Sequence, residues 1–457
     1  MATVLPKAYV AAISGETRLA YVLHHFWQAY ADVPNVSIGY AEQQPQVEIV
    51  DGADDFFAQQ LPYPSEPNWR DWLGRRLPFF FDLAPDKPLL ELRLDGKAII
   101  HSDLVSAAFY LLSGWQEYFS DARDQHGRFP FSASVQHRYG FVAVPVVNYY
   151  FDIMKTAVEH VTGQPLQPRR WAKNAPFAAF ITHDIDNLLS AWKAPAKAAL
   201  FRFDWLGFGR QLWQHFTQRD VWDNLAEVQQ TVAAYGAKST FFFLPEHRRS
   251  PNYTPNADYK LRKIWPQIAT AIGRSEVGLH GSIGRAVQGS KLKEEEHQLQ
   301  RCVEGQIPGI RFHYLQWEPR ITPVIVSSLR FSYDTTLGFA EHFGFRNSYC
   351  LPFYPFDFNQ AKSHNFFEIP LNVMDATLHH PRYLQLAPNE ILPALTPMFQ
   401  EIERFGGVCT VLWHNENFDP ANTRNGPLQF RELMEYLRGR GTAFVTGTDI
   451  LGEMVKL

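Results

Sequence analysis

The C-terminal part of the chain alternates short apolar strands with helices, and this rhythm limits its possible folds more than any other feature. The candidate strands are FAAFIT (177–182), STFFFL (239–244), EVGLHG (276–281), IRFHYL (310–315), RFSYDT (330–335), FFEIPL (366–371), CTVLWH (409–414) and AFVTGT (443–448). Short strands that alternate with helices predict parallel βα units. Polar residues stand at the C-terminal ends of many of these strands, which favours a closed barrel over an open sheet.

The segments between the strands have the pattern of amphipathic helices that end at glycine. Segment 220–238 is expected to place its apolar residues, Trp222 included, on one face and to stop at Gly236. Segments 389–407 and 430–441 end on glycines in the same way. Helices that end at glycine between successive strands are typical of repeated βα units.

The chain has 457 residues, a length that suits two or three domains. Its first part mixes strand-like runs with helical stretches such as 105–120, and proline and basic residues then cluster at 162–176. We therefore predict two domains of α/β class. A smaller N-terminal α/β domain of unknown role occupies residues 1–165, and a β/α barrel occupies residues 176–457.

Composition excludes several classes of function. The net charge of −4 and the pI near 6.5 provide no basic field for a nucleic-acid partner. Three scattered cysteines are too few for a disulfide framework or a zinc knuckle. The N-terminus lacks the features of a secretory signal, and no apolar run is long enough to span a membrane, so we expect a cytoplasmic protein without a transmembrane segment. Aromatic residues make up 15%, which suits both large cores and sugar-binding clefts.

The first predicted strand ends in an unusual cluster of ionisable groups. The stretch AAFITHDIDN (178–187) places His183, Asp184 and Asp186 within four positions of each other. Neighbouring carboxylates repel one another and are costly to remove from water. Such a pair therefore indicates a cation between the carboxylates, or a carboxylate that accepts a proton.

Other polar residues interrupt the ends of the later strands, and in a barrel all of them would face one mouth. They are His280, Arg311, His313, Asp334, Asp375 and His414. One carboxylate and two imidazoles form a ligand set that suits Zn²⁺, or a similar divalent ion, with an open position for water.

Three motifs carry a resemblance to a known family. THDID (182–186), RFHY (311–314) and VLWHN (411–415) follow one another in the order seen in the polysaccharide deacetylase superfamily, also called carbohydrate esterase family four. The resemblance covers about the last 280 residues. It implies a distorted β/α barrel that uses a bound metal to remove acyl groups from the amide nitrogens of sugars. The N-terminal part resembles an uncharacterised domain that precedes some bacterial members, and this implies no activity.

One motif departs from the family. The family has His-x-x-x-His, in which both histidines bind the metal, whereas this chain reads HGSIG, with His280 present and Gly284 in the second place. His313 stands where the family has proline, and residues two apart in an extended segment project to one side, so it should share a cavity with Arg311. We predict Asp186, His280 and His313 as the metal ligands. The pair at positions 379 and 380 (His379 and His380) is the rival source of the third ligand, and the ion is Zn²⁺ or alternatively Co²⁺, Ni²⁺ or Mn²⁺.

The resemblance also implies roles for four catalytic residues. Asp184 would be the general base, and Arg311 would orient its carboxylate and keep it ionised. The backbone N–H of Tyr314 would help to stabilise the oxyanion, and His414 would protonate the departing amine. The family has an acid beside this histidine, where this chain has Asn415.

Structural roles stay open at several of these positions. Asp184 and Asp186 could cap a helix, and each histidine could be a hydrogen-bonded core residue. Asp334 and Asp375 could lie in loops, contact substrate or orient a histidine. The aromatic-rich segment 190–216 is expected to pack over the barrel top, with a lid or a sugar-stacking platform as alternatives.

The prediction for function is a metal-dependent hydrolase that removes an acyl group, acetyl as the first candidate, from the amide nitrogen of a carbohydrate. The substrate is a polymer, or a sugar on a nucleotide or lipid carrier. Two alternatives remain: a hydrolase of a non-sugar C–N bond, and a non-catalytic carbohydrate-binding or assembly protein. The sequence does not define the oligomeric state.

Overall fold

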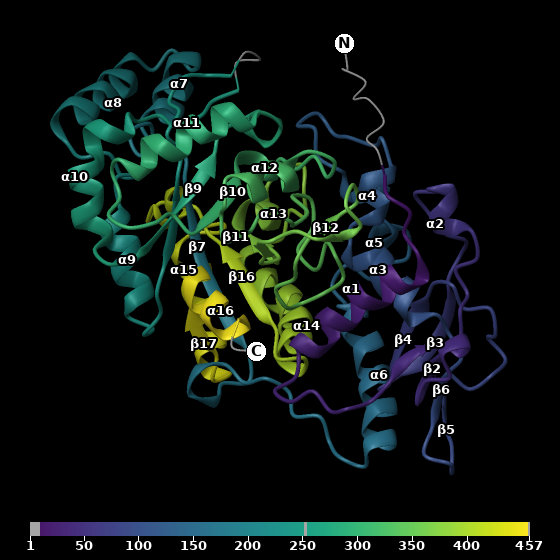
Figure 1. Cartoon of the computed structure of the whole chain (residues 1–457). Coiled ribbons are helices and arrows are strands. Elements are labelled where there is room, and N and C mark those ends of the chain that lie inside the picture. Colours follow the sequence, from purple (N-terminus) through teal and green to yellow (C-terminus); the bar gives the residue numbers. More distant parts are fainter. Residues whose placement is uncertain (1–9, 251–253, 456–457) are drawn as a thin grey trace.

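The computed structural model describes residues 10–250 and 254–455 and contains two main β-sheets (Figure 1). The first nine residues of the predicted N-terminal domain and the last two of the predicted barrel lie outside the described residues. The smaller sheet has the order β1-β2-β6-β5, in which only β5 is antiparallel to its neighbour. Its strands are β1 (Ile38–Tyr40), β2 (Val47–Ile49), β5 (Leu90–Leu92) and β6 (Ala98–Ile100), beside the hairpin of β3 (Asn68–Trp72) and β4 (Arg75–Phe79).

Helices pack around this smaller sheet. They are α1 (Gly15–Gln28), α2 (Phe56–Gln59), α3 (Leu104–Leu112), α4 (Trp115–Phe119), α5 (Val135–Arg138) and α6 (Val146–Thr162). The single helix expected over 105–120 is divided, because Gly114 adopts a φ of +71° between α3 and α4. All nine residues of α3 are buried, so this helix forms the centre of the N-terminal part.

The larger sheet is parallel throughout and has the order β14-β11-β10-β9-β8-β7-β16-β15, with β17 paired to β7. Its strands are β7 (Ala178–Ile185), β8 (Thr240–Phe243), β9 (Glu276–Gly281), β10 (Gly309–Phe312), β11 (Tyr333–Asp334), β14 (Phe367–Glu368), β15 (Val373–Met374), β16 (Val408–Leu412) and β17 (Ala443–Val445). Within this sheet the two end strands, β14 and β15, pair with one neighbouring strand each. The sheet is therefore a distorted barrel that stays open at one side.

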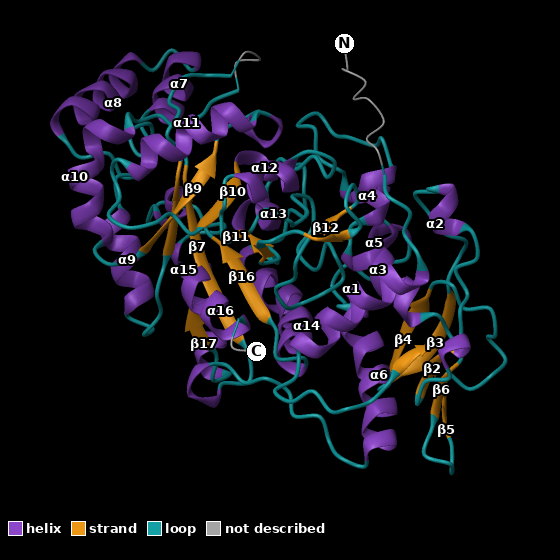
Figure 2. Cartoon of the chain, in the orientation of Figure 1, coloured by secondary structure: helices purple, strands orange, loops and turns teal. Residues whose placement is uncertain are grey.

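Most helices of this part cover the outside of the sheet, whereas α7 (Lys193–Phe201) and α8 (Trp205–Thr217) lie beyond one of its ends, as Figure 2 shows. The other helices are α9 (Leu225–Ala233), α10 (Leu261–Ile272), α11 (Gly289–Gln300), α12 (Thr322–Ser328), α13 (Asp375–His379), α14 (Ile391–Arg404), α15 (Pro427–Gly439) and α16 (Gly447–Met454). A short antiparallel pair, β12 (Phe356–Asp357) with β13 (Lys362–Ser363), stands apart from the barrel. Every residue of β7 and β8 is buried, as expected for strands covered on both faces.

The predicted βα alternation is confirmed for most of the barrel, but among the described residues no helix separates β11 from β14 or β14 from β15. Each of the eight predicted strands overlaps an observed one, whereas β15 was not predicted. The helix expected over 220–238 is shorter, because α9 begins at Leu225 and leaves Trp222 outside it. A two-residue strand such as β15 carries too little periodicity to stand out in a sequence.

The core runs without a break from the N-terminal part into the barrel part. One cluster of buried apolar side chains contains residues of both, including an edge-on contact of Phe109 with Phe356 at 4.9 Å between ring centroids. A buried ion pair lies in the same region, where Arg346 Nε and Nη2 donate to the two carboxylate oxygens of Glu117 at 2.8 and 2.6 Å. The predicted boundary at 162–176 stays a prediction, and the two parts share their packing.

The Glu117–Arg346 pair should be important for stability. We expect Glu117→Ala to lower the free energy of unfolding by about 3–5 kcal/mol, because it leaves the Arg346 charge buried and unpaired. Chemical denaturation followed by circular dichroism measures this change. The exposed pair Arg440–Glu403 serves as the control, and Glu403→Ala should cost about 1 kcal/mol or less. Equal losses in the two variants would contradict this interpretation.

Candidate metal centre

Adjacent parallel strands bring the polar residues together at one end of the sheet. Asp184 pairs in register with Phe242 of β8, and His280 of β9 pairs with Arg311 of β10. Parallel strands end at the same edge, so residues from four different stretches of the chain meet at the carboxyl ends of these strands. The sequence segments that ended in polar residues thus form one site.

Three of these residues form a group that could hold a metal ion. One ligand atom each from Asp186, His280 and His313 lies within 4.8 Å of the others. The Nε2 atom of His280 lies 3.4 Å from Asp186 Oδ1, and the Nε2 atom of His313 lies 3.3 Å from Asp186 Oδ2. Among the described residues this is the one such group, and it matches the predicted ligand set.

The spacing of these atoms fits a small divalent ion. Tetrahedral Zn²⁺ with bonds of about 2.0–2.1 Å separates its ligand atoms by about 3.4 Å, longer than a direct charged hydrogen bond of about 2.8 Å. The Oδ1 atom of Asp186 is buried and has no hydrogen-bond partner among the described residues. A carboxylate oxygen of this kind needs a positive group. The donor set of one carboxylate and two imidazoles suits such an ion in its chemistry as well.

A second interaction prepares His280 to act as a ligand. Its Nδ1–H donates to the backbone carbonyl of Arg311 at 2.9 Å, so in the neutral ring Nε2 keeps its lone pair. Burial on its own raises the pKa of the Asp186 carboxyl, but His313 and His280 outweigh this and hold it well below its usual range. Asp186 is therefore an anion that faces two imidazole nitrogens.

His313 reaches the site by a different local structure from the one expected. The predicted extended segment 310–315 ends at Phe312, and a 3-10 turn (His313–Leu315) follows it. The turn is tight because Tyr314 and Leu315 both have positive φ, at 59° and 54°. The prediction placed Arg311 and His313 two apart on one extended strand. In the structure it is the turn after the strand that brings Nε2 of His313 to Asp186.

The backbone conformation at Gly284, the position of the family's second histidine, favours glycine. Its φ is +81°, a conformation that residues with a side chain rarely adopt. Its N–H donates to Oε1 of Gln316 at 2.8 Å, which ties this turn to the segment that carries His313. The turn at Gly284, where the family has its second histidine, is therefore hydrogen-bonded to the segment that follows His313.

The second carboxylate of the strand end pairs with the buried arginine. Nη1 of Arg311 donates to Oδ1 of Asp184 at 2.9 Å and to the hydroxyl of Thr182 at 2.8 Å. The arginine is held further by Thr335, whose carbonyl and hydroxyl oxygens both accept from it. Oδ2 of Asp184 lies 3.5 Å from Nε2 of His280, on the side of the metal group. One oxygen of Asp184 is therefore fixed, and the other faces the site.

A histidine and a carboxylate, His414 and Asp375, form a second polar pair at the site. Nδ1 of His414 lies 2.8 Å from Oδ1 of Asp375, and its backbone N–H donates to Oδ2 of the same group. Burial on its own lowers the pKa of His414, but Asp375 and the site's other carboxylates raise it to about 10. Nε2 of His414 lies 3.8 Å from Asp186 Oδ2. The acid that the family has at the position of Asn415 comes here from the end of β15.

Asn415 itself has a structural role. Its side-chain amide donates to the carbonyls of Asn187 and Trp222 at 2.9 and 2.8 Å, which ties the loop after β16 to the loop after β7. Next to it, Glu416 accepts a hydrogen bond from the Asn187 amide at 2.5 Å. Burial raises the pKa of Glu416 to about 7, partly offset by that hydrogen bond. No pattern in the sequence singles out Glu416.

The N-terminal part also contributes to the site, which the sequence did not predict. Nη1 of Arg128 donates to the carbonyl of Tyr314 at 3.0 Å, and the ring of His126 stacks on that of Tyr314 with centroids 4.8 Å apart. Gln316 donates to the carbonyl of His126 at 2.9 Å. The strained turn after β10 is therefore held in place by a loop almost two hundred residues earlier. Sequence spacing cannot detect such a contact.

The remaining candidates lie outside the metal group. His183 is fully buried, with ring nitrogens 2.7 Å from the Trp413 carbonyl and 3.2 Å from the Ser239 hydroxyl, so it packs the strand. Nδ1 of His379 lies 3.2 Å from the backbone oxygen of Asp375, and His380 is in the adjoining turn. Asp334 accepts hydrogen bonds from the backbone N–H and the hydroxyl of Thr336, and burial raises its pKa to about 6.

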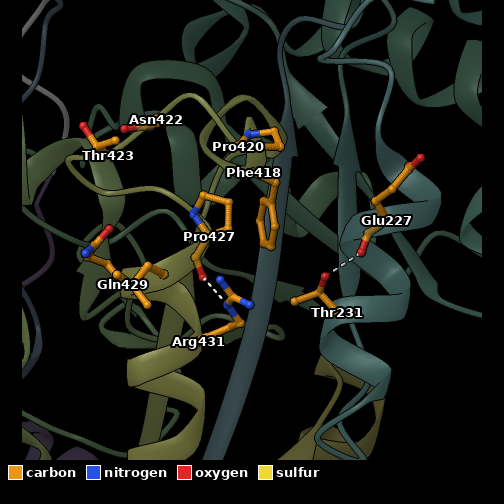
Figure 3. Close-up of a pocket in the computed structure, with 10 residues that line it drawn as sticks. Glu227, Thr231, Phe418, Pro420, Asn422, Thr423, Pro427, Gln429 and Arg431 are labelled. Carbon is orange, nitrogen blue, oxygen red and sulfur yellow. Dashed lines mark hydrogen bonds between the residues drawn. The ribbon is translucent and has the colours of Figure 1, made fainter.

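A hollow of about 430 Å³ on the flank of the barrel is separate from this site (Figure 3). It lies between α9 and the loop that leads into α15, and its lining includes Glu227, Phe418 and Arg431. No residue of the metal group, and neither Asp184 nor His414, lines it. At the site itself, the side chains of Asp186 and His414 are 19% and 18% exposed to solvent.

Comparisons with known proteins give the following likenesses. Residues 7–163 match a family of unknown function (DUF7033). Among solved structures, a probable polysaccharide deacetylase from Pseudomonas aeruginosa PAO1 is 11% identical with a TM-score of 0.43, and covers 63% of this chain and 94% of its own. Puue allantoinase is 12% identical with a TM-score of 0.42, and covers 63% of this chain and 93% of its own. No curated protein matches the chain in sequence. The function is therefore inferred below from the chain's own residues.

Metal binding should depend on His313 and not on His379. We expect His313→Ala to bind Zn²⁺ at least about a hundredfold more weakly while remaining folded, because a ligand is lost from a group of three. His379→Ala is the matched control and should keep the affinity of the unmodified protein. Titration calorimetry with Zn²⁺, together with elemental analysis of protein purified without chelators, measures both. An unchanged affinity in His313→Ala, or a loss in His379→Ala, would reject this ligand set.

Proposed function

We propose that the protein is a metal-dependent hydrolase that removes an acyl group, acetyl in the simplest case, from the amide nitrogen of a carbohydrate. The observation that carries the proposal is the convergence of the metal group with two polar pairs on either side of it. Asp184 with Arg311 forms one pair, and His414 with Asp375 forms the other. This arrangement gives one side of a bound amide a base and the other side an acid.

Asp186, His280 and His313 would hold the ion. When bound, the ion polarises the amide carbonyl and lowers the pKa of a coordinated water, which is the chemistry that amide hydrolysis needs. The Nδ1–H bond of His280 to the Arg311 carbonyl keeps its Nε2 available. The partial exposure of Asp186 leaves an approach for substrate.

The two polar pairs divide the proton transfers. Arg311 holds one oxygen of Asp184, so the other oxygen accepts the proton of the attacking water. Asp375 keeps the imidazole of His414 charged and oriented, so that its Nε2–H can be donated to the departing amine. The backbone N–H of Tyr314, in the turn held by Arg128, would support the negative charge that develops on the carbonyl oxygen.

A carbohydrate substrate is supported by the sequence motifs that resemble the polysaccharide deacetylase superfamily. The alternative substrate is a non-sugar amide on the same scaffold. A panel of N-acetylated sugars, in free, nucleotide-linked, lipid-linked and polymeric form, compared with simple non-sugar amides, separates the two by acetate or amine release. Turnover of the non-sugar amides alone would contradict the carbohydrate assignment.

Removal of the general base should abolish turnover without loss of the metal. We expect Asp184→Asn to lower kcat by about 10²–10⁴-fold, because the amide cannot take a proton from water. Metal content serves as the control and should stay close to that of the unmodified protein. The unfolding transition verifies that the variant is folded at the assay temperature, and its midpoint should fall because the buried Arg311 loses its charge partner. Full activity in this variant would exclude Asp184 as the base.

The Asp375 carboxylate should act through His414. We expect Asp375→Asn to lower kcat by about 10²-fold or more with little change in KM, because the imidazole loses both its orientation and its charge partner. Asp375→Glu should restore part of the activity, which a purely structural defect would not allow. A rise in KM at constant kcat would instead assign Asp375 to substrate binding.

A further inference from the structure

The helical hairpin of α7 and α8 exposes an unusual number of aromatic side chains. Phe201, Phe203, Trp205, Leu206, Trp213 and Phe216 have between 61% and 87% of their surface exposed. Five of the six exposed phenylalanine and tryptophan side chains in the described part of the chain lie on this hairpin, and the sixth is Trp69. Exposed apolar patches of this kind mark binding surfaces. The expectation that this segment packs its aromatics over the barrel top is therefore wrong for these side chains.

The apolar surface of α8 extends onto the exposed side of the helix. Trp205, Trp213 and Phe216 follow at intervals of eight and three residues, which places them on one side of a helix. The less exposed side carries Phe208 and Leu212 together with Gln211 and His215, and the ring of His215 stacks on Trp192 with centroids 4.4 Å apart. A surface helix of a globular protein would normally turn its largest aromatic side chains toward the core, whereas here Trp205, Trp213 and Phe216 remain exposed. The hairpin therefore presents a surface made for an apolar partner.

Positive charges surround this apolar surface. Residues 189–219 contain five basic side chains and one acidic, in a chain whose net charge is −4. Lys193, Lys197, Arg202 and Arg210 form no ion pair within the part of the chain that the structure describes. Lys197 lies over the ring of Phe201 at 5.6 Å, so charge and aromatic surface are adjacent. Basic side chains beside tryptophan and phenylalanine are typical of segments that bind anionic lipid surfaces.

The length of the helices fits a position in the plane of a membrane surface. No helix in the described residues is both long and apolar enough to cross a bilayer. At a rise of about 1.5 Å per residue, the 13 residues of α8 extend about 20 Å, against a hydrocarbon core of about 30 Å. A helix that is too short to cross the bilayer and has an apolar face beside basic residues suits a position in the interface.

We propose that the hairpin of α7 and α8 docks the protein onto the surface of a membrane that contains anionic lipids. Aromatic and leucine side chains enter the headgroup boundary, and the four unpaired basic side chains contact lipid phosphates. The partner is thus a lipid surface of negative charge. This docking does not depend on the reaction at the metal centre.

The hairpin is anchored beside the metal centre. Asp258 accepts hydrogen bonds from the backbone N–H groups of Leu188 and Leu189 and from the hydroxyl of Ser190, all between 2.6 and 2.8 Å. Its own N–H donates to the carbonyl of Asp186 at 3.3 Å. In Figure 1 both helices lie at the upper left edge of the molecule, beyond the end of the sheet to which β9 points. If the proposed function holds, docking therefore presents the site to sugars carried on membrane lipids.

Vesicle binding by the full chain tests the proposal. We expect the protein to co-sediment with vesicles of equimolar phosphatidylcholine and phosphatidylglycerol, and to bind phosphatidylcholine alone at least tenfold more weakly. Binding should fall as salt is raised, since part of it is electrostatic. Tryptophan fluorescence should shift to the blue on binding, because Trp205 and Trp213 leave water. Failure to bind the mixed vesicles at low salt would overturn the proposal.

Two variants and a matched control assign the binding to the hairpin. The aromatic variant should bind at least tenfold more weakly, and each charge removed from the basic variant should weaken binding about fivefold. The aromatic variant is Phe203→Ser, Trp205→Ser and Phe216→Ser, the basic variant is Lys193→Gln, Lys197→Gln, Arg202→Gln and Arg210→Gln, and the control is Leu83→Ser, Leu94→Ser and Leu428→Ser, at exposed leucines elsewhere. The control should bind normally.

Other outcomes are equally decisive. Normal binding by both hairpin variants would show that the lipid contact lies elsewhere. A dimer in light scattering that the aromatic variant dissociates, without vesicle binding, would identify a second copy of the chain as the partner. Thermal melting verifies that each variant is folded, and because the basic variant changes only exposed side chains, it tests the surface even if the aromatic variant is unstable. Acetate release from soluble substrates should be the same in all variants, which separates docking from catalysis.

Discussion

Two carboxylates at the end of one buried strand are the constraint on which this molecule depends. Asp184 and Asp186 cannot both stay charged in this position unless positive groups approach them from other strands. Arg311 forms an ion pair with Asp184, and the imidazoles of His280 and His313 face Asp186. These positive groups come from β9 and from the end of β10, two and three strands away from β7 in the sheet.

The N-terminal part is joined to this arrangement by packing and by polar contacts. Buried aromatic side chains of both parts form one core, and the buried pair of Glu117 with Arg346 lies within it. Arg128 then holds the carbonyl of Tyr314, next to His313, the proposed third ligand. A turn with two successive positive φ angles needs support from outside its own segment. The shape of the site is therefore a property of the whole chain.

One loop, between β7 and α7, connects the site to the aromatic hairpin. The same loop that leaves β7 with Asp186 continues within a few residues into α7, and Asp258 bonds to it on both sides of Asn187. One side of this loop is polar and faces the metal group, whereas the hairpin beyond it turns aromatic rings outward. Under the two proposals, a metal site beside a lipid-binding surface would suit a substrate that has a polar head on an apolar carrier.

The sequence by itself determined the βα alternation, the resemblance of three motifs to one family and the residue types of the site. Strand-end polarity is a local signal, so residue type and position alone pointed to Asp186 and His280, and left His313 with His379 and His380 as rivals for the third place. Tertiary structure decided what depends on distant segments. Asp375 as the partner of His414, Arg128 as the support of Tyr314 and the outward direction of the aromatic rings on α8 all belong to this second class. Contacts between residues far apart in the chain leave no periodic pattern in the sequence. The pattern of a helix shows which residues share a face, but it does not show which face is exposed to solvent.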